Sequence, residues 1–337
     1  MNITETVIGV AILTMMQACM PKTLFDILRD RPRDLLVHPL QWKLHHLEVV
    51  GCRFDNVEPP AYLESTHKDH KDAERGKPDD AEGLACNPFP DSKHRCLYRI
   101  LVGEGRRFAR TRKGSRFYFQ GRPVHRPRYT VFHRHETPFD NRSPPLVGYI
   151  HYTSINGDRW RHFKGRSLAT KGTTQTGANS YHAQLALTTP EDWTEDPYFL
   201  FILLALGQLQ HRLRPSEPIA YISRLLVTNL SDRDSILLCE AEITISLLNA
   251  LRNLKTAIEP IIRLVIRRKK IPYKPYDTFA DRLTDELVAS NPPDHVNHAS
   301  SHKTKRCHEK DDTEDDCGSR IIHSPLSIRR LQVTRWS

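Results

Sequence analysis

Short motifs that identify an enzyme family are missing from this sequence. It contains no G-x-G-x-x-G or Walker phosphate-binding loop, no G-x-S-x-G nucleophile elbow, no protein-kinase motif set and no H-E-x-x-H metal pair. Those motifs place glycines, nucleophiles and metal ligands where dinucleotide, acyl-transfer, kinase or zinc-protease chemistry needs them. We therefore favour a non-enzymatic binding or scaffold protein, and we assign no catalytic residue, metal or cofactor.

Cysteines are too few and too widely spaced to predict a disulfide framework. Seven occur in 337 residues, and no two of them form a C-x-x-C pair. An odd number at wide spacing is typical of proteins whose thiols stay reduced. We expect an intracellular protein, in the cytoplasm or the nucleus.

No apolar run in the sequence reaches the roughly 20 residues that a membrane-spanning helix needs. Residues 6–20 are rich in apolar side chains, but no Lys or Arg precedes them. A signal peptide has a positively charged start, so an amphipathic helix is the preferred interpretation and a signal peptide the alternative. We therefore predict no transmembrane segment.

Apolar residues make up 38% of the chain, against about 45–50% in ordinary globular proteins. Two polar stretches, 56–95 and 291–337, account for the shortfall, because they contain too few aliphatic residues to form a core. We predict a loop or disordered insert at 56–95 and a disordered tail at 291–337. A helical and strand segment at 1–55 and an α+β core domain at 96–290 complete the expected layout.

The most core-like stretch runs from Asp196 to Ile245. Asp196 is a suitable N-cap and Pro197 suits the first helical position, and the residues up to Leu206 are all apolar. A helix that is apolar on every side is buried on several faces. We expect a buried helix at 197–212, followed by two paired strands at 219–230 and 235–245.

Other elements follow from apolar periodicity. We expect helices at 2–30, 245–254 and 277–287, and strands at 46–50, 97–102, 116–120, 129–134, 146–154, 181–187 and 261–266. Asn156-Gly157 favours a two-residue hairpin turn between the segments 149–153 and 159–163. Together these elements predict an α+β fold with an antiparallel or mixed sheet and packed helices.

Four segments in the last part of the core are similar to those of a known protein group. They are Asp196-Pro-Tyr with the helix after it, Arg224-Leu-Leu-Val227, Cys239-Glu-Ala-Glu-Ile243 and Lys270-Ile-Pro-Tyr-Lys-Pro-Tyr-Asp-Thr-Phe279. They resemble a group of uncharacterised proteins from filamentous fungi that has no assigned activity. The resemblance covers about 190–290, implies one folding unit there, and carries over no site residue.

Positive charge is concentrated between Arg106 and His135, a span that contains no acidic residue, in a chain of net charge +10. Guanidinium groups neutralise phosphates and aromatic faces stack on unpaired bases, so the span is a candidate contact for nucleic acid or another polyanion. A solvated face of a sheet is the alternative. The basic residues are Arg106, Arg107, Arg110, Arg112, Lys113, Arg116, Arg122, Arg126, Arg128 and Arg134, and the aromatic ones are Phe108, Phe117, Tyr118, Phe119, Tyr129 and Phe132.

An acidic set gives the alternative function, a divergent or degenerate metal-dependent nuclease. Carboxylates on neighbouring strands can hold a divalent ion that activates water. Such sites place a Lys two residues after the Glu on the strand, and a second Glu stands there instead. Lys269 or Lys270 could replace it only through tertiary structure, so a turn and a solvated or Arg224-paired strand face remain open. The acidic residues are Asp232, Asp234, Glu240 and Glu242.

Two weaker patterns complete the set. His133, His135, His151 and His162, and the group Cys86, His94 and Cys96, lack the short paired spacing of zinc sites. Arg267-Arg-Lys-Lys270 resembles a nuclear import signal. That signal would work only if exposed, and the charged end of a strand is the other interpretation.

Overall fold

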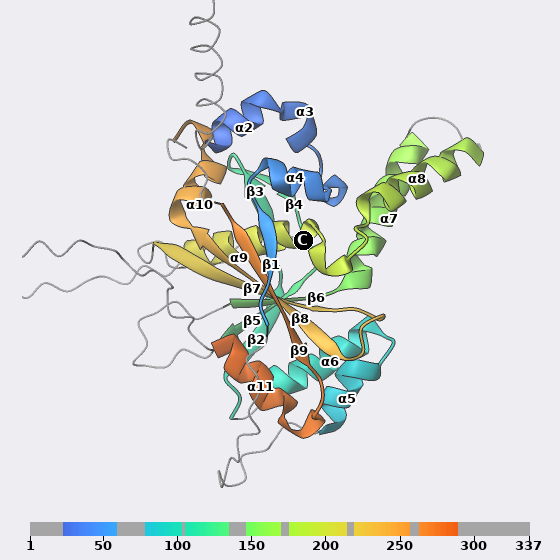
Figure 1. The fold of residues 1–337 in the computed structure, drawn as a ribbon, viewed down its shortest axis with the longest axis vertical. Helices are drawn as coiled ribbons and strands as arrows, with labels where there is room; N and C mark the ends of the chain where they lie inside the picture. Colours follow the sequence, from blue (N-terminus) through green and yellow to red (C-terminus); the bar gives the residue numbers. More distant parts are fainter. Residues whose placement is uncertain are drawn as a thin grey trace, which may run out of the picture. The chain divides into compact units, whose positions relative to one another are not determined.

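The protein combines a mixed seven-stranded sheet, a small second sheet and packed helices (Figure 1). This computed structural model describes residues 23–58, 78–102, 105–134, 146–169, 175–213, 219–256 and 263–288. The predicted α+β class is confirmed. The predicted tail at 291–337 and residues 59–77 of the predicted insert lie outside the described residues, as does the apolar stretch 6–20.

The large sheet has the strand order β1-β9-β8-β7-β6-β5-β2, and β3 and β4 form the small sheet. β6 pairs with β7 and β1 with β9 in parallel, and the other neighbouring strands are antiparallel. The strands are β1 (Arg53–Asn56), β2 (Phe108–Lys113), β3 (Phe117–Phe119), β4 (Arg122–His125), β5 (Thr130–Arg134), β6 (Leu146–His151), β7 (Ala220–Thr228), β8 (Ser235–Thr244) and β9 (Val265–Pro272).

Helices cover both faces of this sheet. They are α2 (Leu24–Asp30), α3 (Pro32–Leu35), α4 (Leu44–Val49), α5 (Pro78–Cys86), α6 (Pro90–Leu101), α7 (Tyr152–Ala169), α8 (Gln175–Thr188), α9 (Tyr198–Leu213), α10 (Ile245–Arg252) and α11 (Tyr276–Val288). Short 3-10 turns lie at η1 (Pro39–Gln41), η2 (Trp193–Glu195) and η3 (Leu254–Thr256).

Helix α9 lies against β7 and β8 and is buried, as predicted. The side chains of Phe199, Leu203 and Leu206 are all 0% exposed. A methyl group at Gly207 would lie 3.0 Å from Ile243 of β8, so the helix packs close to the sheet at a point where only a glycine fits without a shift. The predicted helix and the two strands that follow it are confirmed.

Strand β8 separates two hydrophobic cores. Leu237, Cys239, Ala241 and Ile243 belong to the core under α9, whereas Ile236 and Leu238 belong to the core under α5, α6 and α11. Side chains alternate between the faces of a strand, so one strand serves both cores. Figure 1 shows α5, α6 and α11 gathered on one side of the sheet and α2, α4 and α10 on the other.

Two expectations at 56–101 are wrong. The stretch 78–95 contains α5 and the first half of α6, and residues 97–102 belong mainly to α6, not to a strand. Lys93, which is 1% exposed, connects the two helices because its Nζ donates to the carbonyl oxygens of Leu84 and Ala85, the latter at 2.9 Å. An ammonium group at a helix C-terminus satisfies carbonyls that have no partner inside the helix. Burial lowers the pKa of Lys93.

The hairpin predicted at Asn156-Gly157 is also wrong, because both residues lie inside α7. Tyr152, Ile155, Arg159 and Phe163 are buried and recur at helical spacing along α7. That buried stripe fixes the segment as a helix against η1 and β6, and tertiary packing overrides the local turn preference. The expected strands at 46–50 and 181–187 are likewise parts of helices, α4 and α8.

A buried ion pair anchors α7 to the start of α9. Arg159 donates to both carboxylate oxygens of Asp196, at 2.6 and 2.7 Å, and neither side chain is exposed. The Tyr152 hydroxyl donates to the same carboxylate at 2.9 Å, and so does the backbone N–H of Tyr198. Burial and then the Asp196 charge raise the pKa of Tyr152, so its hydroxyl stays protonated and remains a donor. Asp196 therefore caps α9 as predicted and also fixes α7.

Candidate functional site

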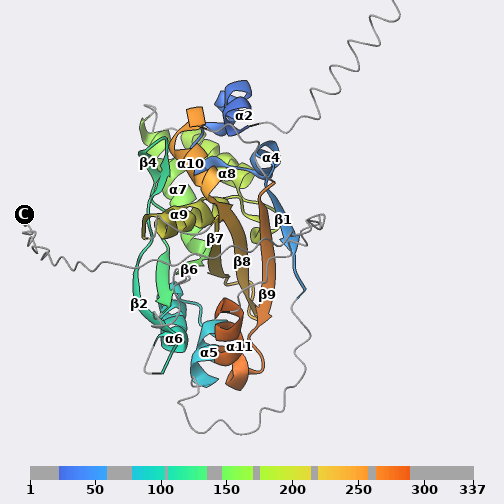
Figure 2. The same cartoon turned by 90° about the vertical axis from the view of Figure 1, so that its left-hand side faces the viewer.

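The basic span folds as a ribbon along one side of the molecule: β2, the hairpin β3–β4 and the start of β5. Figure 2 shows β2 and β4 along the same side. β2 is the last strand in the order of the large sheet, so among the described residues one of its edges has no neighbouring strand. We refer to residues 106–128 as the basic ribbon. Its exposed basic side chains are Arg107, Lys113, Arg116, Arg122, Arg126 and Arg128.

The other predicted contacts differ. Arg106 and Arg134 are only partly exposed, and the side chains of Arg110 and Arg112 lie outside the described part of the structure. Arg128 forms an ion pair with Asp158 at 3.4 Å, and Asp158 also pairs with Arg161. The ribbon is therefore positively charged and largely exposed, with partial neutralisation where it meets α7.

The aromatic side chains of the span do not support the stacking part of the prediction. Phe108, Phe117, Tyr129 and Phe132 are at most 4% exposed and belong to the two cores. Tyr118 is fixed by Gln208, whose side-chain amide bonds its backbone N–H and C=O at 2.9 and 2.7 Å, and by the Arg212 guanidinium above its ring. The aromatic side chains anchor the ribbon to the two hydrophobic cores. The exposed groups of the ribbon that a partner can contact are therefore mainly its cationic side chains.

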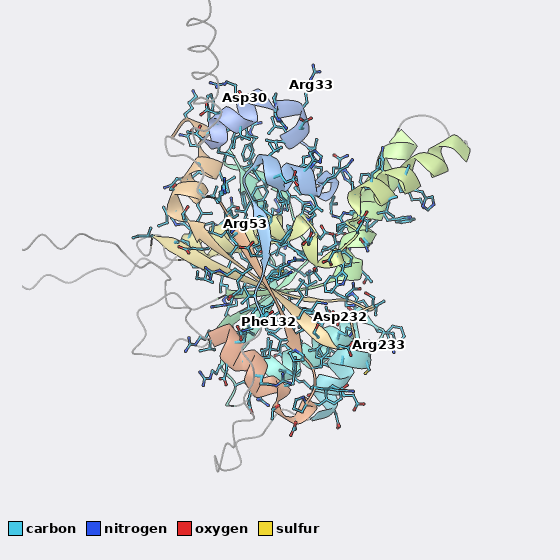
Figure 3. All side chains as sticks on the ribbon, in the orientation of Figure 1. Asp30, Arg33, Arg53, Phe132, Asp232 and Arg233 are labelled. Carbon is cyan, nitrogen blue, oxygen red and sulfur yellow. The ribbon has the colours of Figure 1, made fainter. Side chains whose placement is uncertain are left out.

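The acidic set is spread along the β7–β8 hairpin. Asp232 accepts bonds from the backbone N–H groups of Asp234 and Ser235 and pairs with Lys270 at 3.3 Å. Figure 3 shows Asp232 and Arg233 at this turn, beside α5 and α6. Glu240 instead pairs with Arg224 on the neighbouring strand.

The two carboxylates are too far apart to share an ion. The Asp232 carboxylate is bonded to the backbone N–H of Ser235, at the start of β8. Glu240 lies five positions further along the strand, which is roughly 17 Å at the rise of a strand. Glu242 is exposed and lies on the same face of β8 as Glu240, two residues further along the strand. Among the described residues no group of three His, Cys, Asp or Glu side chains could hold a metal ion. The described acidic residues therefore do not form the metal centre that the nuclease alternative needs.

The predicted import signal does not form an exposed segment. Residues 267–270 lie inside β9, whose backbone pairs with β8 on one side and β1 on the other. Arg268 is 5% exposed and pairs with Glu195 at 2.7 Å, Lys269 pairs with Glu286, and Lys270 pairs with Asp232. Because an import signal must be read as an extended exposed chain, this segment is a structural part of the sheet.

The histidines considered as a weak zinc pattern are distributed over both faces of the sheet. His151 and His94 lie on the α6 side, and His162 stacks on His38 on the α9 side with ring centroids 4.2 Å apart. His135 lies outside the described residues. Burial lowers the pKa of His151 to about 4. Burial lowers the pKa of His94 as well. Cys96 is buried and Cys86 exposed, and both are free thiols.

A cavity that sequence reasoning did not predict lies on the α9 side of the sheet. Its volume is about 420 Å³, and α2, α3, β3, β4, α9 and α10 contribute to its wall. Apolar side chains from segments far apart in sequence form it, so no local pattern could have indicated it. Its described lining residues are Leu24, Leu28, Leu35, Leu36, Val37, His38, Pro39, Trp42, Val50, Cys52, Phe117, Phe119, Val124, Leu200, Phe201, Leu204, Leu247, Leu251 and Leu264.

No protein-family model matches this chain, and neither a curated protein nor a solved structure matches it. In the part of the chain that the structure describes, no helix is both long and apolar enough to cross a membrane.

Proposed function

We propose that this protein is a non-enzymatic intracellular binding protein that contacts an anionic polymer, such as a nucleic acid, through the basic ribbon. The observation that carries the proposal is the exposure of six Lys and Arg side chains on one continuous ribbon whose sequence contains no acid. Cationic side chains release counterions from a polyanion, which gives affinity without sequence specificity. The free thiols of Cys86 and Cys96 support a reducing compartment, cytoplasmic or nuclear.

The ribbon is suited to this contact because it is held rigidly. The Arg212 guanidinium lies over the Tyr118 ring, 5.2 Å from its centroid, and donates to the Ser115 hydroxyl. Gln208 of α9 holds the backbone of β3. A preorganised row of charges loses little conformational entropy when a partner binds. Lys and Arg on an edge strand also discourage pairing with another sheet, and the experiment below separates the two roles.

The test is the affinity of a fluorescently labelled single-stranded oligonucleotide, measured by anisotropy over a series of salt concentrations. The variant carries Arg116→Glu, Arg122→Glu and Arg126→Glu, which leave the core untouched. We expect binding at low salt that weakens as salt rises, and at least tenfold weaker binding by the variant. The slope of log affinity against log salt should become shallower by about 2, because each lost phosphate contact contributes roughly 0.7 for a single strand.

A matched control carries Arg33→Glu, Lys255→Glu and Lys274→Glu, three exposed positions outside the ribbon. It undergoes the same change in net charge, so it should bind within about threefold of the unmodified chain if the ribbon is the contact. Equal weakening of both variants would show a general charge effect. That result, or the absence of salt-dependent binding, would refute the proposal.

A further inference from the structure

The apolar cavity on the α9 side is too large to be a packing defect. Protein interiors are close-packed and contain few voids larger than a water molecule, whereas this one measures about 420 Å³. That volume corresponds to on the order of fourteen water molecules at about 30 Å³ each. It also falls in the range of roughly 300–1,000 Å³ that is usual for small-molecule sites.

The wall of the cavity excludes charged and strongly polar ligands. Among its described lining residues there is no Lys, Arg, Asp or Glu, and His38 is the one ionisable side chain besides Cys52. A water molecule needs two to four polar partners to be stable in a cavity, and this wall offers few. A buried charge on a ligand would find no opposite charge to offset its desolvation. The complementary occupant is uncharged and apolar.

The cavity reaches the surface through an apolar rim. Leu36 and Val124 line it and are 60% and 41% exposed, whereas Cys52, Leu200 and Phe201 at its base are each 4% exposed. Exposed large apolar side chains beside a ligand-sized space are typical of a binding site mouth.

Two polar side chains, His38 and Trp42, line the cavity, and among the described residues the buried indole Nε1 of Trp42 has no hydrogen-bond partner. The His38 ring accepts the backbone N–H of Leu40 at its Nδ1, at 3.3 Å, and stacks on His162. The edge of His125 lies against the same ring, with centroids 4.7 Å apart. The described lining therefore offers an indole N–H donor and no fixed cation, which suits a ligand hydroxyl or ester group better than a carboxylate.

We propose that this cavity is a binding site for an uncharged, lipid-like molecule, such as a long-chain alcohol, a neutral ester or a sterol. The cavity and the basic ribbon share the β3–β4 hairpin, but the cavity uses its inward apolar side chains and the ribbon its exposed cations, so either proposal can fail without the other. The ligand would be held by burial of its apolar surface between α2, the β3–β4 hairpin and α9.

The first test is saturable fluorescence enhancement of N-phenyl-1-naphthylamine, a neutral apolar probe, by the full chain. We expect 1-dodecanol to displace it at least tenfold more effectively than dodecanoate at pH 8, with both competitors monomeric. The unfavourable burial of a carboxylate without a cation is the reason. Equal or better displacement by dodecanoate, or no saturable enhancement, would overturn the proposal.

A variant that fills the cavity provides the second test. Val50→Trp places a larger side chain in its wall, and Ile222→Trp makes a comparable change at a half-buried position on β7 that does not line it. Affinity for the probe should fall at least tenfold in Val50→Trp and stay within about twofold in Ile222→Trp. Equal affinity in both variants, with folding verified by circular dichroism, would contradict the site.

Thiol labelling of the unmodified chain keeps the test independent of any substitution. Cys52 lines the cavity, and Cys86 is exposed outside it and serves as an internal control. Saturating 1-dodecanol should slow modification of Cys52 by N-ethylmaleimide at least fivefold, read peptide by peptide by mass spectrometry, and leave Cys86 unchanged. No protection of Cys52 would count against the ligand. Probe binding that appears only after removal of residues 1–22 would assign the cavity to the chain's own N-terminal segment and overturn the proposal.

Discussion

The two faces of the central sheet are built from the same strands but are filled differently. On one face, α5, α6 and α11 close over Ile236, Leu238 and Ile271, which are at most 1% exposed. On the other face, α9 packs equally tightly at its centre, but the N-terminal helices and the β3–β4 hairpin leave a cavity beside it. The difference shows that the sheet itself does not create the space.

The elements that surround the cavity explain why the space exists. The wall combines short helices, a two-stranded hairpin and the N-terminal part of α9. These elements contact one another through apolar side chains and do not stack in regular layers. The opposite face is covered by three helices, with Lys93 joining α5 to α6. Regular helix–sheet packing fills space efficiently, whereas a wall assembled from short irregular pieces leaves room for a ligand.

The largest expected effect comes from the ion pair that holds the cavity face together. Arg159→Met leaves the Asp196 carboxylate buried without its counterion, which should lower the free energy of unfolding by about 3–5 kcal/mol. On the closed face, Lys93→Met leaves two carbonyls without their donor, and about 1–3 kcal/mol is expected. Urea denaturation measures both. A smaller loss for Arg159→Met than for Lys93→Met would show that the pair is not the main anchor.

Matched truncations on the two faces test the packing difference directly. Leu283 of α11 is 0% exposed in the closed core, and Leu283→Ala should cost about 3–4 kcal/mol. Leu200 of α9 is 4% exposed but borders the cavity. A side chain beside a void has fewer contacts to lose, so Leu200→Ala should cost at least about 1 kcal/mol less. Thermal and urea unfolding give both values, and equal losses would argue that the cavity is filled by protein.

The smallest expected effect is on how the free energy of unfolding depends on pH, to which one buried histidine on each face of the sheet contributes. Burial, with His162 nearby, lowers the pKa of His125 from 6.5 to about 4, and burial with Lys93 nearby does the same for His151. As the pH falls below about 6.5 the unfolded chain takes up these protons first, so stability decreases until the folded histidines also titrate near pH 4.

His125→Phe and His151→Leu should each make stability fall less steeply over that interval. Urea denaturation at several pH values between 4 and 7 measures the slope. Slopes of the two buried-site variants that equal that of the unmodified chain would contradict the low pKa values.

The sequence allowed the centre of the fold to be predicted, because α9, β7 and β8 carry long apolar runs that only a core can accommodate. It misled at Asn156-Gly157, where a strong local turn signal hid the helical spacing of Ile155, Arg159 and Phe163. The spacing of Lys93, Cys96, Leu97 and Ile100 in α6 was also helical, although the segment was predicted as a strand. Local preference decides little when tertiary packing opposes it.

The candidate sites were predictable only in part. The charge of the basic ribbon follows from composition, but the inward direction of Phe117 and Phe132 depends on which face of each strand meets a core. The role of Asp196 as a cap was visible in sequence, whereas its pairing with Arg159, 37 residues away, was not. The cavity forms only where six separate elements meet, so no single segment of the sequence carries a pattern that predicts it.

The most direct measurement is a crystal structure determined under xenon pressure. Xenon occupies dry apolar cavities and avoids polar, water-filled ones. We expect density for xenon, or for a co-purified apolar molecule, among Trp42, Phe201 and Leu204, and none between α11 and the sheet. Ordered water or protein side chains in that space, with no xenon, would contradict the claim that the α9 face holds an apolar ligand site.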